Sequence, residues 1–337
     1  MWEHEELVVR RGRRSGITTM VAVHSRALGP AVGGTRLKAY PDLDAAVHDV
    51  LRLSRAMTDK CAVAGVPFGG GKSVIALAEG EVLTAARRRD VLLDHADLIA
   101  SFDGGYRTGP DVGTGPEDML VLREITPYSS CLPKSHGGVG SSSAPTAVGV
   151  LASLRAAARQ VFGSADVTGK RVVIAGFGSV GEHLAASLTG ADITVSDIDP
   201  RRERLARDLG YGWVAPEKAV ATPADILVPA AVGGVLAADT DPGAPLVVGP
   251  ANNQLTDDSV AADLAARGIT WVPDFVASAG GIVYVLAREV DGVSHEVALA
   301  RVEAIGETVA AILAAATAAG TTPLREATAL AARRLAG

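Results

Sequence analysis

Cysteine is scarce in this sequence. Only Cys61 and Cys131 occur among 337 residues, which is too few for a framework of disulfides. The two cysteines and the seven histidines also lack the short, regular spacings that mark a structural zinc site. We therefore expect neither a disulfide-stabilised fold nor a bound metal ion.

An excess of basic charge and long apolar runs are missing as well. With 32 lysines and arginines against 38 aspartates and glutamates, the net charge of -6 offers no electrostatic footprint for nucleic acid. No stretch approaches the roughly 18 apolar residues that a membrane helix needs, and the start, MWEHEELVVRRGRRSG, lacks the apolar core of a signal peptide. We expect a cytoplasmic protein that binds neither nucleic acid nor membranes.

One glycine-rich segment is similar to a phosphate-binding loop but lacks its spacing. The segment GVPFGGGKSV covers residues 65–74, whereas a nucleoside triphosphate loop has the pattern G-x-x-x-x-G-K-[ST]. With Gly71 and Lys72 as the last glycine and the lysine, the first glycine would have to stand at position 66, which is Val66. The sequence therefore argues against a P-loop nucleotidase.

The first part of the chain has the pattern of a small α/β domain. Two runs rich in β-branched residues are separated by GRRSG, which predicts a hairpin. From Asp42 onward, apolar residues recur at helical spacing, and Asp42 is placed to cap the helix. The expected elements are strands at 5–11 and 17–25, a helix from Asp42, a strand at 72–77, a helix at 81–102 and a short strand with a loop at 106–114.

The later part of the chain alternates apolar strands with helical segments. This alternation is typical of a parallel sheet that helices cover on both faces. The tail at 294–337 predicts two alanine-rich helices. The expected strands lie at 170–176, 191–199, 224–231, 244–251 and 269–274.

A dinucleotide fingerprint follows the first of these strands. The segment RVVIAGFGSVGEHLAAS places Gly176, Gly178 and Gly181 in G-x-G-x-x-G register between a strand and a helix. The first glycine permits the tight turn, the second lets a pyrophosphate approach the backbone, and the third lets the helix pack on the strand. Ser179 and Val180 complete the loop, so the pyrophosphate would lie on the helix N-terminus.

An acidic residue stands where the ribose of a dinucleotide needs one. Asp197 ends the next strand, 21 residues after Gly176, where its carboxylate can accept hydrogen bonds from ribose hydroxyl groups. The same carboxylate would repel a 2′-phosphate, which favours NAD over NADP as the cofactor. Arg201 and Arg202 lie close in the sequence and weaken that preference.

Two domains are therefore expected. The segment SHGGVGSSSAPT at 135–146 has the composition of a linker. We predict an α/β substrate-binding and oligomerisation domain at 1–140 and a doubly wound Rossmann domain for NAD at 141–309, with a deep cleft between them. The helices of about 310–337 can pack back on the first domain, which the pattern leaves open.

Lys72 has two interpretations. In the first, Gly69, Gly70 and Gly71 form a flexible loop and Lys72 is solvated on the surface. In the second, Lys72 starts the buried strand SVIAL, where loss of water makes an ammonium group easier to deprotonate and suits it to general base catalysis. The residues by themselves leave both interpretations open.

Several segments occur in a characteristic order around the dinucleotide motif: GGTRL (33–37), LRLSRAMTDK (51–60), GGGKSVI (69–75), PDVGT (110–114), GPANNQL (249–255) and PDFVASAGG (273–281). Together they resemble the superfamily of glutamate, leucine, valine and phenylalanine dehydrogenases. The resemblance runs over nearly the whole chain. Locally, TGPDV, GGVGSS, TAVGV and LAREV look most like actinobacterial phenylalanine dehydrogenases.

The resemblance implies catalytic roles for particular residues. Lys60 in MTDK would hold the substrate α-carboxylate, Lys72 would activate water, and Asp111 in PDVGT would carry protons to and from the amino group. Gly33 and Gly34 would let the backbone approach the substrate closely. The implied reaction is the reversible oxidative deamination of an L-amino acid to a 2-oxo acid and ammonia.

On the cofactor side, the resemblance implies that Asn252 and Asn253 bond near the nicotinamide ribose and carboxamide, and that Thr146 lies near the nicotinamide. Two departures from the family pattern fall in this region. Ser278 stands where the family usually has asparagine, and SSSAP at 141–145 replaces the GNPSP of leucine dehydrogenases. Both bear on how the nicotinamide is oriented rather than on pyrophosphate binding.

The substrate side chain is expected to be apolar. Glutamate dehydrogenases carry a lysine immediately before the matching glycine pair, and Val32 stands there, so an acidic side chain would be left without a partner. Val32, Met57, Ile282 and Val285 match positions that contact the substrate side chain, and each also suits an ordinary core. Phenylalanine is slightly favoured by the local resemblance, whereas bulky Ile282 suits valine or leucine.

The sequence therefore predicts an NAD-dependent L-amino-acid dehydrogenase, and the resemblance implies a homo-oligomer. The alternative is a catalytically idle paralogue that binds NAD and acts as a sensor or assembly partner. The presence of Lys60, Lys72 and Asp111 together argues against this alternative, and Ser278 is its only support.

Overall fold

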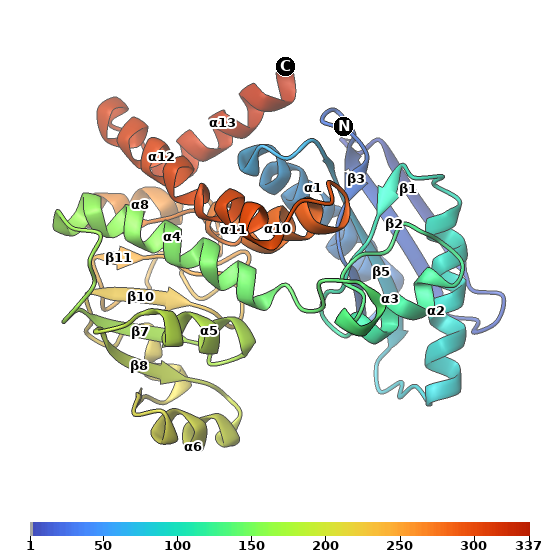
Figure 1. The fold of residues 1–337 in the computed structure, drawn as a ribbon, viewed down its shortest axis with the longest axis horizontal. Helices are drawn as coiled ribbons and strands as arrows, with labels where there is room; N and C mark the ends of the chain where they lie inside the picture. The colour runs from blue at the N-terminus through green and yellow to red at the C-terminus, as the bar shows by residue number, and fades with distance from the viewer. Residues whose placement is uncertain (1–2) are drawn as a thin grey trace. The chain divides into compact units, whose positions relative to one another are not determined.

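The computed structural model describes residues 3–337. Contacts divide the chain into two compact units, which Figure 1 shows coloured along the sequence. The first unit contains the chain up to Ser141 together with Val285–Gly292 and Ala331–Gly337, and the second contains Ser142–Tyr284 and Val293–Leu330. Each unit combines a sheet with helices, which confirms the α/β class.

The first unit is built on a mixed six-stranded sheet. Its central strand is β5, which pairs antiparallel with β2 and parallel with β3 and β4. The predicted hairpin is confirmed, since β1 pairs antiparallel with β2. The strands are β1 (Glu6–Arg11), β2 (Thr18–Ser25), β3 (Ala31–Val32), β4 (Thr35–Tyr40), β5 (Gly69–Ala78) and β6 (Tyr106–Arg107).

Helices cover both faces of this sheet. Met20 of β2 lies in the same apolar core as Val50 of α1, whereas its neighbour Val21 lies in the core that contains Val91 of α2. Successive side chains of a strand point to opposite faces, so the continuous apolar run of β2 fills both cores. The helices are α1 (Leu43–Ala64), which Asp42 caps as predicted, α2 (Ala85–Ala100), α3 (Pro116–Arg123) and a 3-10 turn at Lys134–His136.

The three glycines before Lys72 lie inside β5, so neither a flexible loop nor a strand that begins at Lys72 is correct. The physical reason is close packing on both faces. A Cβ atom on Gly70 would lie 2.1 Å from the backbone nitrogen of Thr58 in α1. On Gly71 it would lie 2.8 Å from the ring of Tyr106. The glycines thus let α1 and Tyr106 approach the strand.

Gly70→Ala is expected to destabilise the first unit by about 1 to 3 kcal/mol, because the added methyl group must push α1 away from β5. The free energy of unfolding in urea measures this change. Gly109→Ala is the matched control, since a Cβ atom there would lie no nearer than 4.0 Å to any neighbour. Equal stability of the two variants would contradict this account of the glycines.

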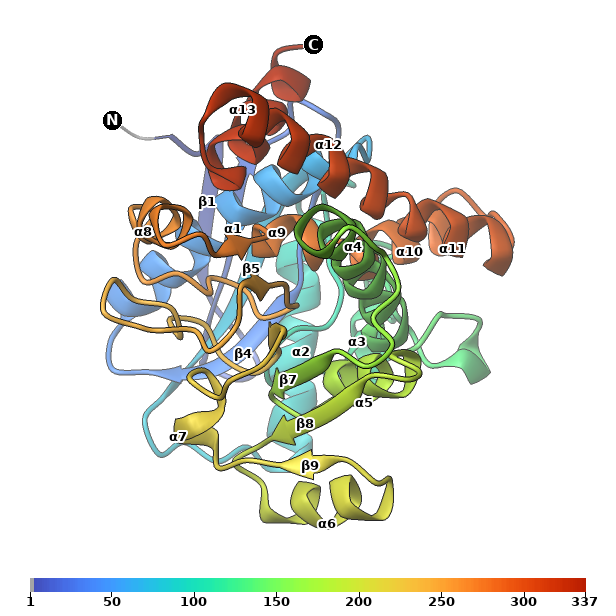
Figure 2. The same ribbon diagram turned by 90° about the vertical axis from the view of Figure 1, so that its left-hand side faces the viewer.

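The second unit contains the predicted parallel sheet. The strand order is β12-β11-β10-β7-β8-β9, and every pairing in it is parallel. Figure 1 shows β11, β10, β7 and β8 side by side, and Figure 2 shows β9 with α6 beyond it. The order changes direction between β7 and β10, and ligands of such sheets bind at the carboxyl ends of the strands beside this point. The strands are β7 (Arg171–Ala175), β8 (Asp192–Ser196), β9 (Gly212–Trp213), β10 (Ile226–Pro229), β11 (Leu246–Val247) and β12 (Thr270–Trp271).

Helix α4 packs against α5 and α12 in this unit. The tail forms three helices instead of the two expected, because the helical run is interrupted at Ala304, and Gly320 ends α12 with a φ of 62°. The helices are α4 (Ser143–Phe162), α5 (Ser179–Ser187), α6 (Pro200–Asp208), α7 (Pro216–Ala219), α8 (Val260–Ala266), α9 (Asp274–Ala277), α10 (Gly280–Glu289), α11 (His295–Glu303), α12 (Ile305–Ala319) and α13 (Pro323–Ala336).

The end of α13 is tied to α1 within the first unit. Nη1 of Arg334 donates hydrogen bonds to the carbonyl oxygens of Ala62, at 2.9 Å, and Val63, at 2.6 Å. These carbonyls lie in the last turn of α1, and that of Ala62 also accepts a hydrogen bond from the backbone N–H of Gly65 at 3.1 Å. Across residues 3–337 no helix has the length and apolar character that crossing a membrane requires.

Candidate active site

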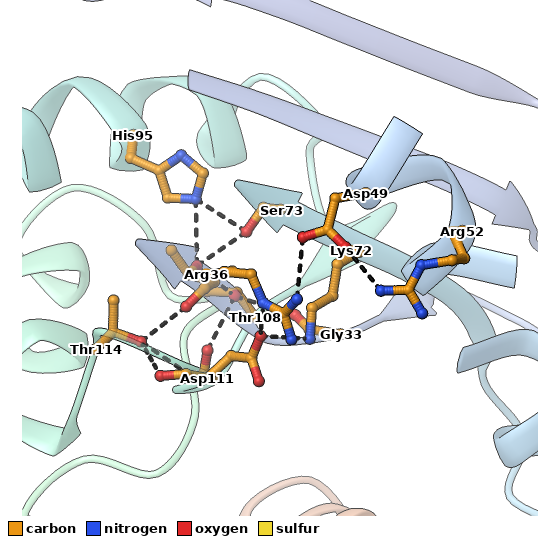
Figure 3. Close-up of polar contacts among 12 residues, drawn as sticks. Gly33, Arg36, Asp49, Arg52, Lys72, Ser73, His95, Thr108, Asp111 and Thr114 are labelled. Carbon is orange, nitrogen blue, oxygen red and sulfur yellow. Dashed lines mark hydrogen bonds and ion pairs between the residues drawn. The ribbon is translucent and has the colours of Figure 1, made fainter. Parts of the chain in front are cut away.

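Lys72 and Asp111 form an ion pair in the first unit. Nζ of Lys72 lies 2.9 Å from Oδ2 of Asp111, and the lysine side chain is only 8% exposed. Residues two apart in a strand share a face, so Lys72 lies on the same face of β5 as Gly70, which α1 covers. Figure 3 shows the two side chains pointing toward each other.

The loop that carries Asp111 runs along β4. The backbone N–H of Thr35 donates to the carbonyl of Gly109 at 2.8 Å, and that of Leu37 donates to the carbonyl of Val112 at 2.9 Å. The N–H of Asp111 itself donates to Oγ1 of Thr114 at 3.0 Å. These bonds hold the loop on both sides of the aspartate.

Gly33 and Gly34 allow β5 and this loop to come together. They separate β3 from β4, and both strands run parallel to β5. A Cβ atom on Gly33 would lie 1.8 Å from the carbonyl oxygen of Gly71, and one on Gly34 would lie 2.9 Å from Cβ of Asp111. A side chain at either position would therefore separate the strand of Lys72 from the loop of Asp111.

Arg36 is a functional candidate that the sequence analysis missed. Its Nε atom lies 2.9 Å from the same Oδ2 of Asp111, and the side chain is 16% exposed. The available signal was the position of Arg36, two residues after the glycine pair, but its strand β4 has little apolar periodicity and was not expected. A charged residue that is this buried needs an ionic partner.

The two cations keep Asp111 ionised. Burial by itself would raise the pKa of Asp111, but the Lys72 ammonium and the Arg36 guanidinium hold it well below its usual range. Asp111 is therefore a carboxylate throughout the neutral and alkaline range, and it offers a negative charge and hydrogen-bond acceptors to a nearby ammonium group.

A buried polar network supports the strands from the opposite face. Nε2 of His95 in α2 lies 3.0 Å from Oγ of Ser73 and 3.2 Å from Oγ1 of Thr35, and its Nδ1 contacts Oγ1 of Thr19. Oγ1 of Thr35 also lies 2.8 Å from Oγ1 of Thr108. Burial lowers the pKa of His95 to about 3, so the imidazole is neutral. The network joins β2, β4 and β5 to the segment after β6.

The remaining predicted substrate residues lie on three elements. Met57 and Lys60 are half-buried and lie one turn apart in α1, beside Thr58, whose backbone contacts Gly70. Val32 is buried in β3 and pairs with Gly70. Ile282 and Val285 lie one turn apart in α10, half-buried and buried respectively.

In the second unit, the glycine-rich turn follows β7. Gly176 has a φ of 122°, and a Cβ atom on Gly181 would lie 2.2 Å from the carbonyl oxygen of Gly176. Gly178 differs, because a Cβ atom there would meet nothing within 4 Å. Ser179 and Val180 form the first turn of α5. The turn is thus tight where helix and strand meet and open where a pyrophosphate would approach, so it fits a dinucleotide.

Asp197 lies directly after β8, beside this turn. Its Oδ2 accepts a hydrogen bond from the backbone N–H of Phe177 at 2.9 Å, and its Oδ1 accepts one from the backbone N–H of Asp199 at 2.9 Å. The two arginines that follow are both paired with acids: Arg201 with Asp199 at 2.8 Å, and Arg202 with Glu182 at 2.9 Å.

The loops after β10 and β11 are joined beside the same edge of the sheet. The N–H of Gly234 donates to the carbonyl of Asn253 at 2.7 Å, and Asn253 has a φ of 54°. Asn252 and Asn253 are both exposed. A Cβ atom on Gly176 would lie 2.6 Å from the backbone nitrogen of Ala231, so the loop after β10 also contacts the glycine-rich turn.

Thr146 and Ser278 lie near the start of α10. Thr146 is in the first turn of α4, and its hydroxyl donates to the carbonyl of Ser142 at 2.8 Å. A Cβ atom on Gly281 would lie 2.6 Å from Oγ1 of Thr146. Oγ of Ser278 is buried and has no hydrogen-bond partner among the residues that the structure describes. In the same residues, no three His, Cys, Asp or Glu side chains group as a metal site would require.

Comparison with protein families identifies two matching segments. The model described as Glu/Leu/Phe/Val dehydrogenase, dimerisation domain, matches residues 4–128. The model described as Glutamate/Leucine/Phenylalanine/Valine dehydrogenase matches residues 204–336. The first match contains Lys60, Lys72 and Asp111.

Individual relatives are similar over most of their length. A valine dehydrogenase from Streptomyces virginiae is 39% identical, with 98% of this chain and 94% of the relative covered. A phenylalanine dehydrogenase from Lysinibacillus sphaericus is 38% identical, with coverages of 90% and 81%. The crystal structure of L-tryptophan dehydrogenase from Nostoc punctiforme superposes with a TM-score of 0.80 at 32% identity, with coverages of 99% and 96%.

Proposed function

We propose that this chain, because it belongs to the glutamate/leucine/phenylalanine/valine dehydrogenase family, catalyses the reversible NAD-dependent oxidative deamination of an apolar L-amino acid. The products are the 2-oxo acid and ammonia. The single observation that supports this most is the 2.9 Å ion pair between the buried Lys72 and Asp111. A lysine and a carboxylate in contact supply the two proton-transfer groups that such a reaction needs.

The residues of the first unit have separate roles in this proposal. Lys60 binds the substrate α-carboxylate as a point charge. Asp111, which is ionised, takes a proton from the substrate ammonium group. NAD, when bound, supplies the acceptor for the hydride that leaves Cα. Lys72 in its neutral form then takes a proton from a water molecule that adds to the imino carbon, which gives a carbinolamine, and Asp111 returns a proton to its nitrogen. The C–N bond then breaks, ammonia leaves, and the hydroxyl group gives its proton to solvent water as the carbonyl of the 2-oxo acid forms.

The proposed cofactor residues belong to the second unit. Gly176, Gly178 and Gly181 form the turn for the pyrophosphate, with Ser179 and Val180 at the helix N-terminus. Asp197 binds the ribose hydroxyls. Asn252, Asn253 and Thr146 contact the nicotinamide half. Binding both reactants in the orientation for hydride transfer contributes much of the rate, because it replaces a bimolecular encounter.

The proposed substrate is phenylalanine, with valine and leucine as the alternatives. Val32 is buried at the position where a charged substrate side chain would need a partner, which supports an apolar substrate. The relatives are named for valine, phenylalanine and tryptophan at 32 to 39% identity, so identity does not separate these substrates. One methylene group changes binding by only about 1 to 3 kcal/mol in such pockets.

A substrate panel tests this function. The protein is incubated with each of the twenty L-amino acids, or with the corresponding 2-oxo acids and ammonia, in the presence of NAD or NADP. We expect reduction of NAD with one or more of phenylalanine, valine and leucine. NAD binding without turnover of any amino acid would instead support the idle paralogue.

Asp197→Ala is expected to weaken NAD binding and to reduce the preference for NAD over NADP at least ~10-fold, because the ribose hydroxyls lose their acceptor and a 2′-phosphate loses its repulsion. The ratio of kcat/KM for the two cofactors measures the effect. Asp192→Ala is the control, since it removes an exposed carboxylate from the other end of β8. An unchanged ratio in Asp197→Ala would remove the ribose role.

The proposed assembly is a homo-oligomer. Its support is the description of the family model over residues 4–128 as a dimerisation domain. Light scattering on the eluting peak of a size-exclusion column tests it, and a monomer at assay concentrations would contradict it.

A further inference from the structure

Five charged residues of alternating sign form a continuous chain in the first unit. Their order is Lys72, Asp111, Arg36, Asp49, Arg52, and Figure 3 shows them together. The four successive ion pairs measure 2.9, 2.9, 3.0 and 2.8 Å. Arg52, at one end of the chain, is 51% exposed, whereas the other four side chains are between 8 and 22% exposed. Solvent therefore screens the inner pairs weakly.

Asp111 uses one oxygen for both of its cations. Lys72 and Arg36 each contact Oδ2, and Figure 3 shows the other oxygen pointing away from them. Arg36 cannot swing freely, because its Nη1 contacts Oδ2 of Asp49. Asp49 is held in turn by the hydroxyl of Tyr40, which donates to Oδ2 at 2.7 Å. The orientation of the Asp111 carboxylate is thus set from α1 through Arg36.

We propose that Arg36, held by Asp49, is a positioning residue that turns one oxygen of Asp111 toward the substrate nitrogen. Its positive charge also weakens the hold of the Lys72–Asp111 pair on the proton that the two groups share. This inference rests on the proposed function, since it concerns the proton-transfer pair of that reaction. It adds two residues, Arg36 and Asp49, that the proposed reaction does not itself require.

The electrostatic part of the inference follows from the order of charges. If Arg36 were neutral, the Lys72–Asp111 pair would lose a neighbouring positive charge and would hold its proton more strongly. If Asp49 were neutral, the charge of Arg36 would be less balanced, and the pair would hold its proton less strongly. Because the pair must give up this proton before it can take one from water, the two changes move the pH profile of the reaction in opposite directions.

Other titratable groups near Asp111 do not account for the expected shifts of the pH profile. Tyr40 in β4 and Tyr106 in β6 both feel the charge of Asp111, but burial raises the pKa of each phenol, so both are neutral at working pH. His95 in α2 is neutral as well. Lys60, in α1, is a further cation and is unchanged in every variant compared.

The test is the pH dependence of kcat/KM for amino-acid oxidation, which reports the groups of the free enzyme. Arg36→Gln is expected to move the midpoint of the rising limb up by about one pH unit and to lower kcat at least ~10-fold. Asp49→Asn is expected to move the midpoint down by about half a unit. Arg36→Lys keeps the charge without the forked contacts, so kcat falls while the midpoint stays near that of the wild type.

Arg89→Gln is the matched control, because it breaks an exposed Arg–Glu pair in the same unit. Its midpoint is expected to equal that of the wild type. Thermal unfolding verifies that each variant is folded. If Arg36→Gln is not folded, Asp49→Asn and Arg36→Lys still test the inference. Unchanged midpoints in folded Arg36→Gln and Asp49→Asn, or shifts of these two variants in the same direction, would overturn the inference. A wild type that oxidises no amino acid would instead contradict the proposed function.

Discussion

Lys72→Ala is expected to lower kcat at least ~100-fold while leaving the affinity for NAD nearly unchanged. The variant removes the group that takes a proton from water, whereas the proposed NAD residues lie on other elements. Steady-state kinetics gives kcat, and fluorescence titration of the protein with NADH gives the cofactor affinity. Thermal unfolding verifies that loss of the ion pair to Asp111 has not unfolded the site.

Lys72→Arg separates a general base from a simple positive charge. Arginine keeps the charge and can pair with Asp111, but it does not deprotonate at working pH. We expect it to be as slow as Lys72→Ala. Lys218→Ala removes an exposed lysine from α7 and should be fully active. Little change of turnover in Lys72→Ala would remove Lys72 from the mechanism.

Asp111→Asn is expected to lower kcat by at least ~100-fold as well. The substitution keeps the shape of the side chain but removes the negative charge that accepts a proton from the substrate ammonium group. It also leaves Lys72 and Arg36 without their shared partner, which destabilises the unit because two buried cations then face each other. Steady-state kinetics at saturating substrate measures the loss of turnover, and urea unfolding measures the loss of stability.

The control for this variant is Asp97→Asn. It removes an exposed carboxylate of α2 that pairs with Arg14. We expect its turnover to match that of the wild type. Turnover of Asp111→Asn within a few-fold of the wild type would show that proton exchange with the nitrogen uses another group.

The sequence was most informative where local chemistry decides the structure. The glycine-rich turn was predicted because the backbone conformation at Gly176 itself requires glycine. The strand-helix alternation around this turn predicted the parallel sheet. The helix from Asp42 was also predicted from its apolar spacing and its cap. The family resemblance, drawn from short motifs over the whole chain, was confirmed by both family models.

Other elements depend on contacts that are distant in sequence. Gly69, Gly70 and Gly71 have poor strand propensity. Glycine is needed at these positions because Ser25, Thr58 and Tyr106, respectively, lie too close for a side chain. The short strands β3, β4 and β9 were not expected. They carry little periodicity of their own, and each is defined by the strand that pairs with it.

In the candidate site, too, the features that depend on contacts distant in sequence were not predicted from the local sequence. The sequence around Lys72 left the role of this residue open. Only the resemblance pointed to its partner Asp111, which is 39 positions away. The structure joins the two because Gly33 and Gly34 let the loop of Asp111 approach β5. Arg36 was missed because its importance depends on Asp111 and Asp49, which come from a loop and a helix on either side of it.

Product stoichiometry tests the central claim most directly. The wild-type protein is incubated with NAD and, separately, with L-phenylalanine, L-valine and L-leucine, and reduced cofactor, ammonia and 2-oxo acid are each quantified. The account predicts that all three products form in equal amounts from at least one of these amino acids and that Lys72→Arg forms almost none. Reduced cofactor without matching ammonia, or equal product formation by Lys72→Arg, would contradict it.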